Sequence, residues 1–183
     1  MKLEELIKAC KKNDRTAQSQ LFEQYKDVLY YISLKYSRNE VEAEDNLHDA
    51  FMVIFDKIGT YKNKGSFEGW MKRITMFKAI DRYKNNKYVP TEFNDNILEA
   101  DVSISSETDS PPLDILLKYI QELPDGYRLV FNMYQMDGYS HKEVARILGI
   151  SEGTSKSNYH RAKLLLQKRI TTEQPHKTQT HGK

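Results

Sequence analysis

The sequence predicts an all-α protein made of two small helical domains that are joined by a flexible acidic linker. Apolar residues recur at three, four and seven positions in residues 1–90 and again in residues 113–170, and this spacing is typical of amphipathic helices. Residues 91–112 lack that spacing, carry six acidic and no basic side chains, and end in two prolines. No long stretch shows the alternation of a β-strand, so we expect a helical domain on either side of a tether.

The first domain, residues 1–90, is expected to hold three or four helices. Two of them are marked by apolar residues on one face, namely Leu21, Val28, Leu29 and Ile32 in the earlier helix and Leu47, Phe51, Ile54, Phe55 and Ile58 in the later one. Gly59 and the polar residues 61–66 interrupt the pattern, because glycine and small polar side chains favour loops. A further helix begins near Phe67, so this loop lies between two helices.

The second domain, residues 113–170, is expected to hold four helices. The apolar residues of its first two helices are Ile115, Leu116, Tyr119, Ile120 and Leu123, followed by Tyr127, Val130, Met133 and Tyr134. Pro124 fits the first turn of the second helix, and Gly138 ends that helix. Residues 171–183 are polar and are predicted to form a disordered tail.

The last two helices of this domain have the layout of a helix-turn-helix, whose second helix enters the major groove of DNA. Ser140 and Glu143 form a capping box that starts the first of the pair, and Gly149 ends it. Ser151 caps the second, which runs to about Ile170. Its expected inward residues are Ser155, Tyr159, Ala162, Leu165 and Leu166. Its outward residues, mostly donors that suit base edges and phosphates, are Lys156, Ser157, His160, Arg161 and Lys163. An ordinary helical hairpin with a basic surface is the alternative.

The composition indicates a cytoplasmic protein, and no cofactor or metal is expected. Cys10 is the single cysteine, so neither an internal disulfide nor a thiolate metal cluster is expected. No apolar run approaches the roughly 20 residues that span a bilayer. The first residues also carry too many charges for a secretory signal, so we expect neither export nor membrane insertion.

The net charge of +2 is unevenly distributed along the chain. Residues 1–90 hold 17 basic and 13 acidic side chains, and residues 113–170 hold nine and six. The acidic segment 91–112 separates these two basic parts. This asymmetry favours a polyanion such as nucleic acid as the partner of both domains.

The helix near residues 41–57 presents a second, mostly acidic face. Its residues are three and four positions apart, namely Asp45, His48, Asp49, Met52 and Asp56. A negative face with a central apolar residue suits docking on a basic partner helix. Two alternatives stay open, a merely solvated face and a nuclease-like metal site. The ligands of that site would be Glu44, Asp45, His48 and Asp49.

The next segment, residues 57–87, is strongly basic, with nine basic side chains against Glu68 and Asp81. Aromatic residues lie among these cations, an arrangement that suits the unstacked bases of single-stranded DNA. Those aromatic residues are Tyr61, Phe67, Trp70, Phe77, Tyr83 and Tyr88. Trp70 and Ile74 are instead expected on the core side of their helix.

The second domain resembles region four of the extracytoplasmic-function sigma factors, within the sigma-70 family, over the segment LPDGYRLVFNMYQMDGYSHKEVARILGISEGTSKSNYHRAKLLLQ. The resemblance implies that it binds the minus-thirty-five element in the major groove. The implied contacts are Lys156, Ser157 and Arg161, with His160 on the same outward face. Ser155 stands where an apolar residue usually packs inward, and Asn158 replaces a common arginine.

The first domain resembles region two of the same family. AEDNLHDAFMVIFDKI is similar to region 2.2, which grips the coiled coil of the polymerase β′ subunit, and His48 stands where glutamine is frequent. SFEGWMKRITMFKAIDRYKNN is similar to regions 2.3 and 2.4, which melt and read the minus-ten element, and residues 61–66 correspond to the base-capturing loop. The implied DNA contacts are Tyr61, Lys62, Lys64, Lys72, Arg73, Met76, Phe77 and Arg82. Phe77 occupies a position where asparagine is common.

The resemblance therefore implies a non-enzymatic sigma factor that binds core RNA polymerase, through its β′ and β subunits, and directs promoter-specific transcription initiation. Further expected partners are promoter DNA, both double-stranded and melted, and an anti-sigma factor. The alternatives are a helix-turn-helix regulator that does not bind polymerase as a sigma factor, and the metal-dependent nuclease. The acidic linker is expected to occupy a cationic channel of the polymerase, or else to act only as a soluble tether. Its carboxylates are Glu92, Asp95, Glu99, Asp101, Glu107 and Asp109.

Overall fold

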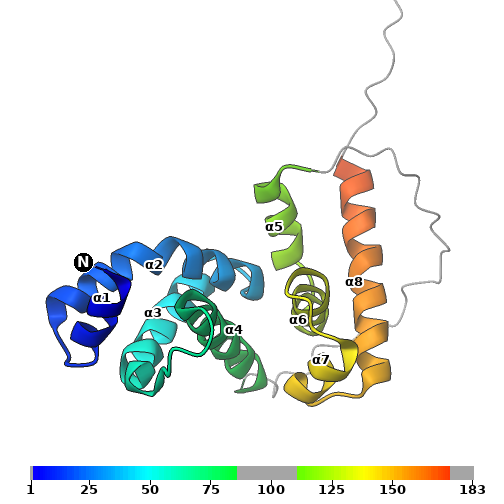
Figure 1. Ribbon diagram of the computed structural model, residues 1–183. Helices are drawn as coiled ribbons and strands as arrows, with labels where there is room; N and C mark the ends of the chain where they lie inside the picture. Colours follow the sequence, from blue (N-terminus) through cyan, green and yellow to red (C-terminus); the bar gives the residue numbers. More distant parts are fainter. Residues whose placement is uncertain (1, 86–110, 174–183) are drawn as a thin grey trace, which may run out of the picture. The chain divides into compact units, whose positions relative to one another are not determined.

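The computed structural model describes residues 2–85 and 111–173, and the regular structure within these ranges is entirely helical, as predicted (Figure 1). The chain divides into two compact units, Met1–Pro90 and Thr91–Lys183, called here the first and second unit. Nearly all of the predicted linker and most of the predicted tail lie outside the described residues. Within the described ranges, no helix combines the length and apolar character that crossing a bilayer requires.

Four α-helices make up the described part of the first unit. They are α1 (Leu3–Cys10), α2 (Arg15–Tyr36), α3 (Glu40–Lys57) and α4 (Phe67–Asn85), with a short 3-10 turn, η1 (Ile58–Thr60), after α3. Side-chain caps set two of the starts. Asp14 accepts the backbone N–H of Ala17 at 2.9 Å to begin α2, and Asn39 accepts that of Glu42 at 2.9 Å to begin α3.

The core of the first unit lies where α2, α3 and α4 pack together. Of the predicted inward residues, Leu47, Phe51 and Ile54 of α3 and Ile58 of η1 are buried, and Phe55 is half-buried against the same core. Trp70 and Ile74 pack against this core from α4, as predicted. One buried polar residue links the three helices, because Asn46 of α3 donates from Nδ2 to Ser33 Oγ and to the Thr75 carbonyl, both at 3.1 Å.

The second unit contains four α-helices and one π-helical segment in its described part. They are α5 (Leu113–Gln121), α6 (Asp125–Phe131), the π-helical η2 (Asn132–Met136), α7 (His141–Leu148) and α8 (Glu152–Glu173). Helix α8 continues three residues past the end predicted at about Ile170. The hydroxyls of Thr171 and Thr172 donate to carbonyls one turn earlier, at 2.9 and 2.8 Å.

The predicted capping residues shape the helix-turn-helix. Ser140 and Glu143 form the expected capping box at the start of α7. Gly149 ends α7 with a φ of 69°, a left-handed conformation that favours glycine. The hydroxyl of Ser151 accepts the backbone N–H of Thr154 at 2.9 Å and so caps α8. The turn between the two helices is thus fixed at both of its ends.

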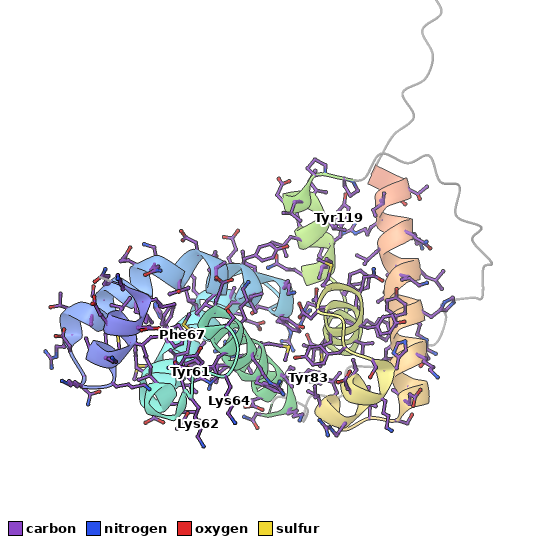
Figure 2. The ribbon with its side chains drawn as sticks, viewed as in Figure 1. Tyr61, Lys62, Lys64, Phe67, Tyr83 and Tyr119 are labelled. Carbon is purple, nitrogen blue, oxygen red and sulfur yellow. The ribbon has the colours of Figure 1, made fainter. Side chains whose placement is uncertain are left out.

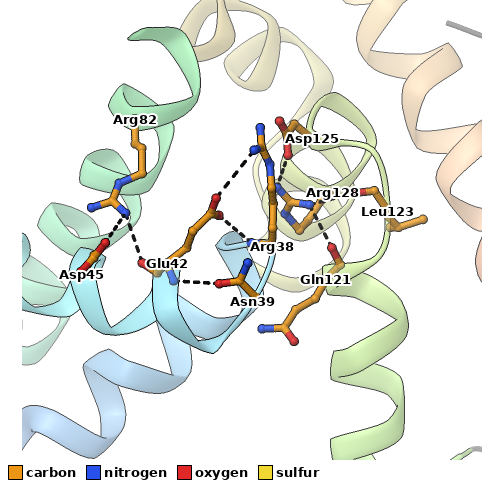
Figure 3. A network of polar contacts seen from close by, with 9 residues as sticks. All are labelled: Arg38, Asn39, Glu42, Asp45, Arg82, Gln121, Leu123, Asp125 and Arg128. Atoms are coloured by element: carbon orange, nitrogen blue, oxygen red, sulfur yellow. Dashed lines mark hydrogen bonds and ion pairs between the residues drawn. The ribbon is translucent and has the colours of Figure 1, made fainter. Parts of the chain in front are cut away.

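A buried arginine fixes the corner between α5 and α6 (Figure 3). Arg128 donates from Nη1 to the carbonyls of Gln121 and Leu123, at 3.1 and 2.8 Å, and its other terminal nitrogen pairs with Asp125. These carbonyls belong to the end of α5 and the turn after it, where helical partners are missing. Arg128 therefore serves the fold, although the sequence shows only another basic residue.

Candidate nucleic-acid and partner interfaces

The acidic face of α3, made of Asp45, His48, Asp49, Met52 and Asp56, is exposed along its whole length. Met52 is 72% exposed, so its apolar side chain lies on the surface among these carboxylates. Val41 is 69% exposed and lies one helical turn before Asp45 on the same line. Val41 is absent from the predicted set, although its position four residues before Asp45 places it on the same side of the helix. The face therefore has an apolar residue near each end and carboxylates between them.

Helix α4 contributes two cations to this acidic face. Arg82 Nη2 lies 3.3 Å from Asp49 Oδ2, and Arg82 Nη1 lies 3.6 Å from Asp45 Oδ2. Lys78 Nζ lies 3.6 Å from Asp49 Oδ2. Figure 3 shows the guanidinium of Arg82 between Asp45 and the carbonyl of Glu42. Arg82, one of the predicted DNA contacts, lies against the carboxylates of α3, and its role in DNA binding stays a prediction.

The loop between η1 and α4 is organised by one buried tyrosine. Tyr61 is 8% exposed, and its ring centroid lies 5.0 Å from that of Phe67 and 5.5 Å from that of Trp70. Its hydroxyl donates to the carbonyl of Gly65 at 2.8 Å, which closes the loop. Tyr61 was expected to face DNA, whereas the structure directs its ring into the core.

The tip of this loop carries two exposed cations. Figure 2 shows Lys62 and Lys64 pointing away from the helices, while Tyr61 and Phe67 lie among them. Asn63 between the two lysines has a φ of 55°, so the backbone turns sharply there. The loop, which the Tyr61–Gly65 hydrogen bond closes, therefore presents Lys62 and Lys64 to solvent.

On α4 the expected DNA contacts separate into two groups. Arg73 is exposed, and its guanidinium lies over the half-buried ring of Phe77, 5.4 Å from the centroid. Lys72 is half-buried and pairs with Glu68 at 2.6 Å. Met76 is buried and belongs to the core side of the helix. Arg73, Phe77 and Lys72 are thus accessible to a ligand, and Met76 is not.

On α8 the outward residues predicted from the spacing include three that are exposed, Lys156, Ser157 and His160. Lys156 pairs with Glu152 at 2.9 Å, and the Ser157 hydroxyl donates to the carbonyl of Thr154 at 3.0 Å. Arg161 is half-buried, and its Nη1 donates to the hydroxyl of Tyr127 at 3.4 Å. The expected inward residue Ser155 is fully buried.

One histidine beside α8 has a perturbed titration. The pKa of His141 is lowered by its burial and, to a smaller extent, by the positive charge of Lys156, while Glu152 acts in the opposite direction. The ring is stacked on Tyr134, with centroids 4.0 Å apart and an angle of 11° between the planes. His141 is therefore neutral at pH 7.

The metal-site alternative has no geometric support in residues 2–85 and 111–173. Nowhere in these ranges do three or more His, Cys, Asp or Glu side chains gather closely enough to hold a metal ion. This includes the four side chains proposed as ligands on α3, which lie along one exposed helix surface and partly pair with cations of α4.

Comparison with known families matches most of both units. The family model "Sigma-70 region 2" matches residues 21–88, and the model "Sigma-70, region 4" matches residues 113–166. Among curated proteins, the ECF RNA polymerase sigma factor SigW of Bacillus subtilis is 30% identical over 93% of this chain and 97% of its own length. SigM of Mycobacterium tuberculosis, also named an ECF RNA polymerase sigma factor, is 30% identical over 88% of this chain and 81% of its own length.

A solved structure shares the fold. The sigma factor RpoE, in complex with the anti-sigma factor NepR from Bartonella quintana, aligns with a TM-score of 0.51 and 19% sequence identity. The alignment covers 86% of this chain and 98% of that one.

Proposed function

Because the chain belongs to the sigma-70 family, in its extracytoplasmic-function group, it is a sigma factor that directs promoter-specific transcription, and we propose which of its surfaces carry out each step. The observation that carries the assignment is that regions 2 and 4 occur together in one chain, at residues 21–88 and 113–166. A simple helix-turn-helix regulator needs only the second of these, so that alternative is not favoured.

The acidic face of α3 is the proposed docking surface for core polymerase. Its exposed carboxylates, flanked by Val41 and Met52, match a basic helix that carries apolar side chains. In the family, region 2.2 holds the coiled coil of the β′ subunit, and the proposed contacts follow that role. They are Asp45, His48, Asp49, Met52 and Asp56. Val41 is added to this set by its exposure.

The loop 61–66 and the outer side of α4 form the proposed surface for melted DNA of the minus-ten element. Lys62 and Lys64 supply exposed charge for phosphates, and the Arg73–Phe77 pair offers a cation and a ring to an unstacked base. Tyr61 acts in this proposal through the loop that its hydroxyl closes, since its ring is buried. Phosphodiester chemistry belongs to the polymerase, and this chain supplies contacts.

The exposed start of α8 is the proposed reader of the minus-thirty-five element. Lys156, Ser157 and His160 lie on one outward face in the first turns of the helix, which is where a recognition helix meets base edges. Arg161 adds a donor from the side of that face, although it also bonds to Tyr127. Asn158 is half-buried beside this face, and in the proposal its side-chain amide influences which base is preferred there.

An anti-sigma factor is the remaining proposed partner, in keeping with the family. The sigma factor RpoE, which shares the fold, was solved in complex with the anti-sigma factor NepR. This role also implies a cytoplasmic protein, because polymerase and chromosomal DNA lie there. The proposal that the acidic linker occupies a cationic channel of the polymerase concerns residues that lie almost entirely outside the described ranges.

Co-elution with core polymerase tests the assignment. Purified chain is mixed with core polymerase and separated by size, with the Asp45→Lys and Asp49→Lys double variant run in parallel. The proposal predicts that the wild-type chain elutes with polymerase and that the double variant elutes mostly alone. A wild-type chain that binds DNA but never elutes with polymerase would favour the regulator instead.

A further inference from the structure

A partly buried hydrogen bond joins the two helices of the helix-turn-helix. Nδ1 of His141, the first residue of α7, lies 3.0 Å from Oγ of Ser155 on α8. Ser155 has no exposed surface, and its hydroxyl therefore depends on protein partners. The hydrogen bond spans the turn at Gly149, between the start of one helix and the first full turn of the next.

An aromatic cluster holds the imidazole in place. The His141 ring is stacked on Tyr134 of η2, and it meets Tyr159 of α8 at 5.8 Å with an angle of 60°. Tyr134 and Tyr159 also contact each other, with ring centroids 4.7 Å apart. The Tyr159 hydroxyl donates to Gln135 Oε1 of η2. The ring of His141 is thus confined between η2 and α8, with Nδ1 directed at Ser155.

We infer that His141 and Ser155 form a positioning pair that sets how α8 is presented to the minus-thirty-five element. This inference rests on the proposed function. Ser155 directly precedes Lys156 and Ser157, and successive helical residues are turned by about 100°. A small rotation of α8 at Ser155 therefore changes where the neighbouring outward side chains meet the groove. A serine at this inward position is therefore suited to the fold because His141 supplies a hydrogen-bond partner for its hydroxyl.

The pair works with neutral imidazole. The charged and titratable groups that face His141 are Lys156, Glu152 and Tyr159 of α8 and Tyr134 of η2. Burial and Lys156 disfavour the imidazolium. In the neutral ring Nδ1 either accepts the hydrogen bond of the Ser155 hydroxyl or donates to its oxygen, depending on the tautomer, and protonation leaves only the donor role and adds a positive charge near Lys156. The pair is therefore most stable above the ordinary histidine pKa of about 6.5, and the desolvated charge and its repulsion by Lys156 weaken it as the pH falls through the lowered pKa of folded His141.

The experiment compares four variants of the full chain, assembled with core polymerase. They are His141→Ala, His141→Asn, Ser155→Ala and the double His141→Ala/Ser155→Ala. The readout is the ratio of affinity for duplex DNA containing a minus-thirty-five element, selected with the wild type, to affinity for a scrambled duplex. Circular dichroism is used to choose a temperature at which every variant is folded. Affinity for the scrambled duplex serves as a control, because it shows whether each variant keeps its charge-based binding to DNA.

The pair predicts a specific pattern in this ratio. His141→Ala and Ser155→Ala each lower it by about three- to tenfold at pH 7.5, the size expected from one hydrogen bond. The double variant loses no more than either single one, because the two residues act together. His141→Asn keeps most of the ratio, since its side-chain amide bonds to the Ser155 hydroxyl in place of Nδ1. Lowering the pH to 5.5 reduces the ratio for the wild type more than for His141→Asn, because only the wild type gains a charge at this position.

The opposite pattern overturns the inference. If losses in the two single variants add in the double variant, or if His141→Asn is as poor as His141→Ala, the residues do not act as a pair. If the wild type discriminates and all variants match it, α8 is positioned without them. A wild type that itself does not discriminate contradicts the proposed function instead, which separates the two failures.

Discussion

The guanidinium of Arg82 lies 3.3 Å from the carboxylate of Asp49, and this ion pair joins the basic helix α4 to the acidic face of α3. Lys78 reaches the same carboxylate from one turn earlier on α4. These ion pairs bring the face of α3 that is proposed for polymerase against α4, whose outer side is part of the surface proposed for DNA. Asp49 is shared between a contact within the fold and the proposed docking surface, and the side chains involved are about half exposed or less, so the pair itself is weak.

The first prediction concerns polymerase docking. Replacing both Asp45 and Asp49 with lysine should weaken binding to core polymerase by about tenfold or more, because charge reversal places like charges against a basic partner. Fluorescence titration of the labelled chain with core polymerase measures this. Reversing Glu4 and Asp114, two exposed carboxylates outside α3, gives the same change in net charge as a control. Equal affinities for the two double variants would remove the acidic face of α3 from the docking surface.

The second prediction compares two pairs of cations in the first unit. Replacing Lys62 and Lys64 with glutamine should lower the slope of log affinity for single-stranded DNA against log salt by about 1.4, if each lysine neutralises one phosphate. Replacing Lys78 and Arg82 removes the same charge but should change the slope less, because carboxylates of α3 already face these cations. Binding isotherms at several salt concentrations provide both slopes. A larger change for the α4 pair would contradict this expectation and support Arg82 as a DNA contact.

The third prediction concerns the buried amide of Asn46. Asn46→Ala removes two hydrogen bonds, to Ser33 and Thr75, from a site that is 1% exposed. The free energy of unfolding of the first unit should fall by about 2–3 kcal/mol. Urea unfolding followed by the fluorescence of Trp70, the single tryptophan, reports on this unit. Asn85→Ala, at an exposed position, should change it by less than about 0.5 kcal/mol, and equal effects would contradict the bridging role of Asn46.

The fourth prediction separates two lysines of α8. Lys156→Ala should reduce transcription from a promoter that requires the minus-thirty-five element by about five- to tenfold, since it removes a donor from the exposed start of the helix. Lys168→Ala removes the same charge from an exposed position three turns later and should have little effect. Transcription assays on one template with both variants make the comparison. If the two variants behave alike, the outward face of α8 is wrongly assigned.

Local patterns predicted the helices and several of their ends, although α8 continues past its predicted end. The inward residues of α3 follow from their spacing, and the capping box at Ser140, the glycine turn at Gly149 and the cap at Ser151 follow from local chemistry. Such features depend on residues within one or two turns of each other. They need no knowledge of how helices cross, so the sequence is sufficient for them.

The direction of individual site residues depended on tertiary packing. Tyr61 lies in a loop without period, so nothing in the sequence indicated that its ring packs against Phe67 and Trp70. The contact between Arg82 and Asp49 depends on how α4 crosses α3. These two residues are 33 positions apart in the sequence, so no local pattern indicates that they meet. Ser155 was correctly expected to face inward, but its partner His141 lies in another helix. Met76 was predicted as a DNA contact, but the packing of α4 on the other helices buries its side chain.

Promoter-directed transcription is the most direct measurement of the central claim. Core polymerase is incubated with a library of promoter fragments, with and without the purified chain, and the RNA products are sequenced. We expect discrete transcripts that appear only with the chain and start downstream of a shared pair of elements. They should be lost with the Asp45→Lys/Asp49→Lys variant. Transcripts that are the same with and without the chain, while the chain remains folded, would contradict its role as a sigma factor.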